Sequence, residues 1–287
     1  MLTRTLLLIT GLLVFGACSR YYGPGSLGMS QSPAPVPYHV SDGDMRDQVH
    51  LEAAFANGAV YNADDANESI LLRGHVFLPF EPIHFGRNSP VRQNRRSYLI
   101  LGLSVQLGRY DIRNDSFPSL RGQQNYTAFG FRIGMGNFVQ DGKLKSGYST
   151  LVEFGVETGP FAQTVRRFDD VELNLFFSGS TPSTGLPPLS EFSNVPVMSY
   201  QISPYWQYLV SDRLRLGWGG QFGFTYEGLR LHGTAGLQLS LTSHPVCLRG
   251  NFTFLTRNRP PRIGNLSFPA RSGVFDLGVS VALHTGE

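Results

Sequence analysis

Hydrophobic and polar residues alternate along most of the chain, from about residue 47 to the C-terminus. In residues 99–107, for example, every second residue is Leu or Val, and smaller or polar residues lie between them. A period of two predicts β-strands whose two faces meet different environments, because successive side chains of a strand point to opposite sides. Ten such runs occur, at residues 49–55, 70–80, 99–107, 129–135, 152–156, 198–208, 214–224, 229–241, 246–254 and 275–283.

The length of the runs indicates which environment the apolar face meets. Several runs reach 10 to 12 residues, whereas a soluble strand averages about 5–6 and a tilted transmembrane strand needs about 9–11. The central positions of the apolar face carry Leu, Phe, Val and Ile without Lys, Arg, Asp or Glu. The pattern therefore predicts an all-β fold over residues 47–287, an antiparallel up-and-down transmembrane barrel of about ten strands.

The opposite face combines Gly and Ser with ionisable residues of both signs. Small residues with interspersed charges suit a narrow lumen, where side chains meet across a restricted space. Unpaired charges would be costly there, so we expect these side chains to form ion pairs. The predicted lumenal polar network consists of Glu52, Arg73, Arg132, Glu153, Glu157, Arg215, Arg230, His232, Arg249 and Asp276.

The connections give an orientation. Periplasmic turns of bacterial barrels are short and external loops are long. With an even number of strands, both termini face the periplasm, and the long connections at 108–124, 161–197 and 256–273 face outward. The long connection at 81–95 and the short turn near Glu227-Gly228 depart from this pattern.

The first residues indicate export. Residues 1–17 have a positive Arg4 and an apolar stretch too short to span a membrane, which is typical of a signal peptide. The stretch ends in Phe15-Gly16-Ala17-Cys18, which resembles the lipobox of bacterial lipoproteins. The resemblance implies that Cys18 is acylated and becomes the first mature residue; ordinary secretory cleavage is the alternative. Residues 18–46 are rich in Gly, Ser and Pro and are predicted to be a flexible tether.

Composition and charge narrow the function further. A net charge of +3, with 16% charged residues, does not favour a nucleic-acid partner. The two cysteines, Cys18 and Cys247, lie far apart, so neither a disulfide framework nor a metal site is expected, and no cofactor is predicted. The only two lysines, Lys143 and Lys145, are assigned to one short connection.

A search for catalytic arrangements finds weak candidates. The sequence lacks G-x-S-x-G, H-E-x-x-H and P-loop motifs. His232 lies two residues from Thr234, and Asp169-Asp170 adjoins Arg166-Arg167 in a long loop. A lumenal histidine and a local salt bridge are the simpler interpretations, so we do not expect an enzyme.

The body of the chain resembles small outer-membrane barrels of the OmpA and OmpW type. The resemblance rests on stretches such as residues 203–224, SPYWQYLVSDRLRLGWGGQFGF, a strand–tight turn–strand unit. It implies an outer-membrane protein in contact with lipid and lipopolysaccharide, inserted by the barrel-assembly machinery, with a structural, surface-interaction or small-solute transport role. The alternative is a periplasm-facing lipoprotein whose soluble barrel or sandwich binds an apolar ligand, with the Leu/Phe face inward. The sequence leaves the oligomeric state open.

Overall fold

The computed structural model describes residues 48–59, 66–80, 95–112, 121–164, 166, 194–211, 214–227, 230–243, 245–257 and 271–284. In these segments ten strands form one closed barrel, so the expected fold class is confirmed. The strands are β1 Gln48–Ala59, β2 Ala66–Phe80, β3 Arg95–Ile112, β4 Gly122–Asp141, β5 Leu144–Thr158, β6 Val195–Leu209, β7 Leu214–Glu227, β8 Arg230–Ser243, β9 Val246–Arg257 and β10 Arg271–His284.

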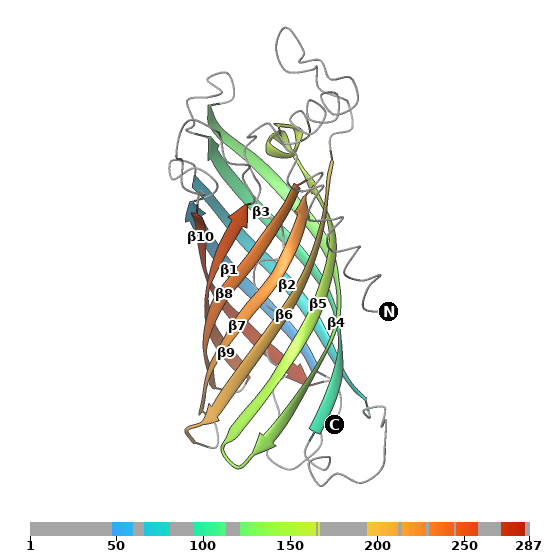
Figure 1. The fold of residues 1–287 in the computed structure, drawn as a ribbon, viewed down its shortest axis with the longest axis vertical. Helices are drawn as coiled ribbons and strands as arrows, with labels where there is room; N and C mark the ends of the chain where they lie inside the picture. Colours follow the sequence, from blue (N-terminus) through green and yellow to red (C-terminus); the bar gives the residue numbers. More distant parts are fainter. Residues whose placement is uncertain are drawn as a thin grey trace, which may run out of the picture.

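Each strand pairs antiparallel with its neighbours in the sequence, and β1 pairs with β10 to close the sheet (Figure 1). The closing ladder runs from Gln48 opposite His284 to Ala59 opposite Gly273. Closure leaves no strand edge with unpaired backbone groups, which is the condition that a β-structure must meet to exist in lipid.

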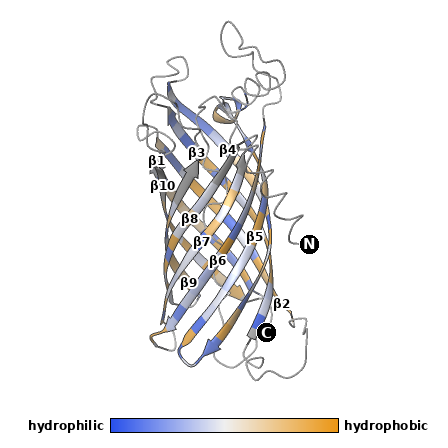
Figure 2. Ribbon diagram, in the orientation of Figure 1, coloured by the Kyte–Doolittle hydropathy of each residue, from blue (hydrophilic) through white to orange (hydrophobic). Residues whose placement is uncertain are grey.

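The two faces of the strands differ as the alternation predicts. On every strand, large hydrophobic side chains point outward and are 38–68% exposed, with Leu239 and Leu103 the most prominent at 68% and 66%. Charged side chains at outward positions of the described strands lie near strand ends, at Glu68, Arg109 and Asp141 among others. Figure 2 shows the resulting alternation of orange and blue along the strands. The soluble alternative is therefore wrong about orientation, because the Leu/Phe face points out and the Arg/Gly face points in.

The strands are longer than the hydrophobic pattern predicts. They range from 12 to 20 residues, and β4 is the longest. The excess arises where outward residues become polar, as at Gln123, Asn125 and Thr127 of β4, so the ladder continues after the apolar alternation has ended. The alternation of hydrophobic residues thus predicted the apolar band correctly but did not predict the polar ends of the strands.

Chain direction assigns the connections to two rims. The β4–β5, β6–β7 and β8–β9 connections lie at the lower rim of Figure 1, where Gly142 (φ 54°) forms the tight β4–β5 turn. The opposite rim carries a short helical turn at residues 160–164, directly after β5. No helix within the described segments is long and apolar enough to cross a membrane.

Candidate functional site

The lumen contains a cluster of charged side chains halfway along the strands, centred on Glu52 of β1. The Glu52 carboxylate accepts a hydrogen bond from Arg249 of β9, and its Oε1 lies 3.6 Å from Nη1 of Arg73 on β2. All three residues are at most 4% exposed. They occupy inward positions because the alternation that places Leu51 and Leu72 on the outside places Glu52 and Arg73 on the inside.

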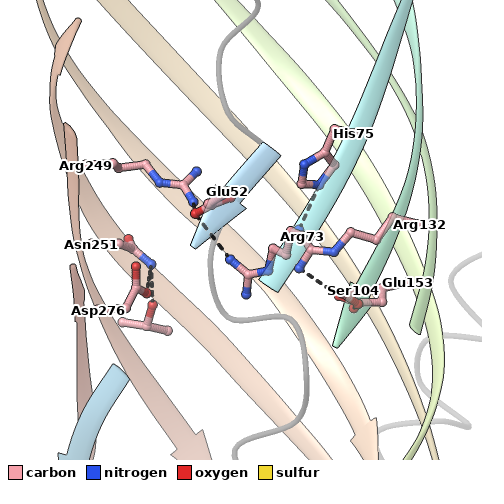
Figure 3. Close-up of polar contacts among 10 residues, drawn as sticks. Glu52, Arg73, His75, Ser104, Arg132, Glu153, Arg249, Asn251 and Asp276 are labelled. Atoms are coloured by element: carbon pink, nitrogen blue, oxygen red, sulfur yellow. Dashed lines mark hydrogen bonds and ion pairs between the residues drawn. The ribbon is translucent and has the colours of Figure 1, made fainter. Parts of the chain in front are cut away.

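A second ion pair lies beside the first (Figure 3). Nη2 of Arg132 on β4 lies 2.9 Å from Oε2 of Glu153 on β5, and the Ser104 hydroxyl donates to Oε1 of Glu153 at 2.6 Å. Nη1 of Arg132 lies 3.2 Å from Nε2 of His75. Because a guanidinium can only donate, this His75 nitrogen accepts the bond and the proton of the neutral ring is on Nδ1.

Together these groups cross the lumen. Glu52, Arg73, Arg132, Glu153 and Arg249 come from five different strands, and Figure 3 shows them in a row from β9 to β5. Burial of an isolated charge costs several kcal/mol, roughly, so each carboxylate here requires its arginines. We call these five residues the lumenal charge cluster.

The other members of the predicted polar network come from β5, β7, β8 and β10. Asp276 of β10 accepts a hydrogen bond from Nδ2 of Asn251 at 3.1 Å. Glu157 and Arg215 are buried at inward positions of β5 and β7. Arg230 and His232 lie on β8, and their side chains are outside the described part of the chain.

Below the charge cluster, toward the lower rim, the lumen is filled by apolar side chains. A buried core cluster consists of Phe77, Tyr98, Ile100, Phe138, Leu151 and Tyr205. Lys145 is buried with them, and its Nζ lies 4.0 Å from the ring centroid of Phe138. The assignment of Lys145 to a connection was wrong: β5 begins at Leu144, and Lys145 is its first inward residue.

Above the charge cluster, aromatic side chains pack together near the upper rim. Phe161, in the 160–164 turn, is fully buried and stacks on Tyr110 with ring centroids 4.2 Å apart. Its centroid lies 5.8 Å from that of Tyr126. Beneath these rings, the Tyr126 hydroxyl donates to Asn67 and accepts from Gln106.

The wall formed by β6 to β8 is different in character. Its described inward positions are mostly neutral and polar, and include Gln201, Gln221, Thr225 and Thr234. Within the described residues, the side-chain amides of Gln201 and Gln221 have no hydrogen-bond partner. The lumen therefore has a charged side and a neutral polar side.

Sequence reasoning missed several lumenal residues. The alternation puts His75 and Ser104 on the inward face, but only the three-dimensional contacts join them to Arg132 and Glu153. Lys145 shares the inward alternation of β5 with Glu153, and this signal could have identified it. Phe161 carries no local signal, because its burial depends on strands that precede it by more than thirty residues.

Among known proteins, similarity to this chain is found in solved structures. No protein-family model matches the sequence, and no curated protein does. The fold is similar to the β domain of the Bordetella autotransporter BrkA (TM-score 0.42, 8% identity, 83% of this chain and 100% of that chain covered). It is also similar to the translocator domain of the autotransporter NalP from Neisseria meningitidis, with a TM-score of 0.35, 11% identity, and 84% of this chain and 90% of that chain covered. A third similar structure is the P. putida toluene transporter TodX, with a TM-score of 0.32, 10% identity, and 86% of this chain and 94% of that chain covered. At this level of similarity, no activity of these proteins transfers to this chain.

The catalytic candidates receive no support from geometry. Asp169 and Asp170 lie outside the described residues, as does the His232 side chain. Among the described residues, no group of three His, Cys, Asp or Glu side chains could hold a metal ion. The interpretation as a non-enzyme stays a prediction.

Proposed function

We propose that this protein is an integral outer-membrane barrel whose lumen is a gated passage for small polar solutes. The lumenal charge cluster is the observation that carries the proposal. It crosses the lumen, so an open diffusion pore is not compatible with this conformation. Its members also have alternative partners, because Glu52 is shared by Arg73 and Arg249 while Arg132 contacts both Glu153 and His75.

Exchange between such partners is the physical basis for gating. Movement of Arg73 or Arg249 away from Glu52 leaves the carboxylate with the other arginine, so opening need not leave the buried carboxylate without a partner. An apolar plug of the same volume would be at least as stable as buried ion pairs. A passage for polar solutes explains the cluster better than stability does, and the neutral polar wall of β6 to β8 offers a lining for it.

Membrane location is the second part of the proposal. The outward apolar band without central charges fits hydrocarbon, where an Arg or Lys costs about 2–4 kcal/mol at mid-depth. Closed barrels of this kind belong to outer-membrane-type bilayers, and we infer contact with lipid and lipopolysaccharide and insertion by the barrel-assembly machinery.

Conductance across planar bilayers tests the gate. Wild-type protein is expected to be closed for most of the time. The double variant Glu52→Ala/Arg73→Ala removes one charge of each sign from the cluster and should give more frequent conducting openings and faster swelling of sugar-loaded liposomes.

The control removes the same two residue types from the outer surface. Glu68 and Arg109 form an exposed pair at 2.8 Å, and Glu68→Ala/Arg109→Ala should behave as wild type. If the lumenal variant conducts no more than this control, the barrel is not a passage. It would then be a membrane scaffold, the second candidate, which is favoured by the buried side chains at three separate levels of the lumen.

We further propose that Cys18 is acylated and tethers residues 18–46 to the membrane, as the lipobox resemblance implies. Cells that express the chain with labelled palmitate should incorporate the label, and Cys18→Ala should not. Equal incorporation in both would assign any label to another site.

A further inference from the structure

We propose that the 160–164 turn is a lid that opens and closes the upper mouth of the lumen, with Phe161 as its seal. This inference rests on the proposed passage and adds its point of control. It starts from the complete burial of Phe161 and Ala162, although both follow the last residue of β5 and belong to a connection.

The contacts of the turn with the barrel come from side chains. Phe161 stacks on Tyr110, and the Thr164 hydroxyl donates to Oε1 of Gln124 at 2.7 Å. The backbone bond of the turn, from the Gln163 N–H to the Gly159 carbonyl at 3.0 Å, is local. Because Phe161 and Thr164 contact side chains of β3 and β4, the turn can separate from the rim without breaking the strand ladder.

Gly159 supplies the joint between strand and turn. Its φ of 107° lies in a region that favours glycine. A Cβ at this position would lie 3.0 Å from the Asn125 carbonyl oxygen and 3.2 Å from the Tyr126 Cα. Glycine therefore lets the chain turn sharply from β5 over the rim of β4, which places Phe161 above Tyr126.

The layer beneath the lid is polar and belongs to the lumen. Gln106 donates to Ser69 at 2.9 Å and to the Tyr126 hydroxyl at 3.0 Å, and Tyr126 donates to Asn67 at 2.9 Å. Displacement of Phe161 would expose these groups to solvent at the mouth. Ser69 therefore reports on whether the lid is open.

The test measures the accessibility of a thiol at this position. Ser69→Cys is introduced into the full chain with Cys247→Ser, in lipid nanodiscs, and modification by a charged methanethiosulfonate is followed by site-resolved mass spectrometry. With a movable lid, the thiol is modified slowly but completely in this background, and about tenfold or more faster with Phe161→Ala, because loss of the stacked ring shifts the population toward the open state.

Two controls make the result specific. Phe222→Ala removes an outward phenylalanine on β7 that is 58% exposed, and should leave the modification rate unchanged. Ser280→Cys places a thiol opposite Glu52, at the level of the charge cluster, and should stay unmodified, which excludes general unfolding.

Two results would overturn the lid. If the Ser69→Cys thiol is not modified over hours in the protein that keeps Phe161, the turn is a fixed plug and not a lid. Equal rates with Phe161 and Phe161→Ala show that this ring does not seal the mouth. Modification of the thiol at position 69 does not depend on solute passage. If the lid opens but the barrel never conducts, the proposed passage is refuted and the lid is not.

Discussion

At the residue scale, the same type of ion pair has a different degree of burial on the two faces of the barrel. Glu52 and Glu68 each face an arginine, but the Glu52 pair is almost fully buried, whereas side-chain exposures in the Glu68–Arg109 pair are 45% and 48%. Bulk solvent screens the outer pair, whereas the inner pair is almost fully shielded from it by the barrel. The same substitution at both positions therefore separates the effect of burial from that of charge.

We expect Glu52→Gln to destabilise the barrel by about 3–5 kcal/mol, because it leaves Arg73 and Arg249 buried without their shared carboxylate. Glu68→Gln should cost about 1 kcal/mol or less. Guanidinium unfolding in lipid vesicles, followed by tryptophan fluorescence, measures both. Similar losses at the two positions would contradict the burial of the Glu52 carboxylate with its arginines.

At the element scale, close approach between neighbouring strands depends on inward glycines. A Cβ at Gly134 of β4 would press on the Thr150 carbonyl oxygen and on Leu151 of β5. Backbone atoms of a strand ladder cannot move aside without breaking hydrogen bonds. Gly250 of β9 differs, because a Cβ there would meet the Phe275 ring at ordinary contact distance, 3.8 Å.

Gly134→Ala is expected to cost about 1–3 kcal/mol through overpacking. Gly250→Ala should be neutral or slightly stabilising, since alanine reduces the conformational freedom of the unfolded chain. The same unfolding assay compares them. A stable Gly134→Ala would mean that β4 and β5 are not in the register that places Gly134 opposite Leu151.

At the scale of the whole molecule, the exposed apolar band requires a lipid or detergent environment. Burial of apolar surface stabilises a soluble fold by roughly 25 cal/mol per Å², but here large apolar side chains cover the outside, and polar groups make up most of the inside apart from the apolar cluster near the lower rim. The interior thus provides little of the usual core. Under the membrane proposal, lipid removes water from the outer face and so completes the fold.

A fragment that begins at residue 47 should therefore acquire β-structure only with detergent or lipid. It should then migrate as a compact, heat-modifiable species on gels, which circular dichroism and electrophoresis with and without boiling can establish. A monodisperse β-protein in plain buffer would show that the outer face does not need lipid and would remove the basis of the membrane proposal.

The sequence by itself indicated a barrel of about ten strands, the side of each on which Leu and Phe lie, and the inward placement of Glu52, Arg73, Arg132, Glu153 and Arg249. These are consequences of alternation, a local property that each strand carries in its own residues. The exact strand number was decided by the tertiary structure. Alternation also places Lys145 inside once β5 begins at Leu144, three residues after Asp141 at the end of β4. Strand ends were underestimated because alternation fades where both faces are polar.

Only the tertiary structure decided which of the inward residues meet. Glu52 and Arg249 are 197 positions apart, and closure of β1 onto β10 brings them together. The apolar cluster of Phe77, Tyr98, Phe138 and Tyr205 and the insertion of Phe161 also depend on this geometry. The physical reason is that closure and the stagger between strands set the height of each side chain in the lumen. Neither property can be read from a single strand.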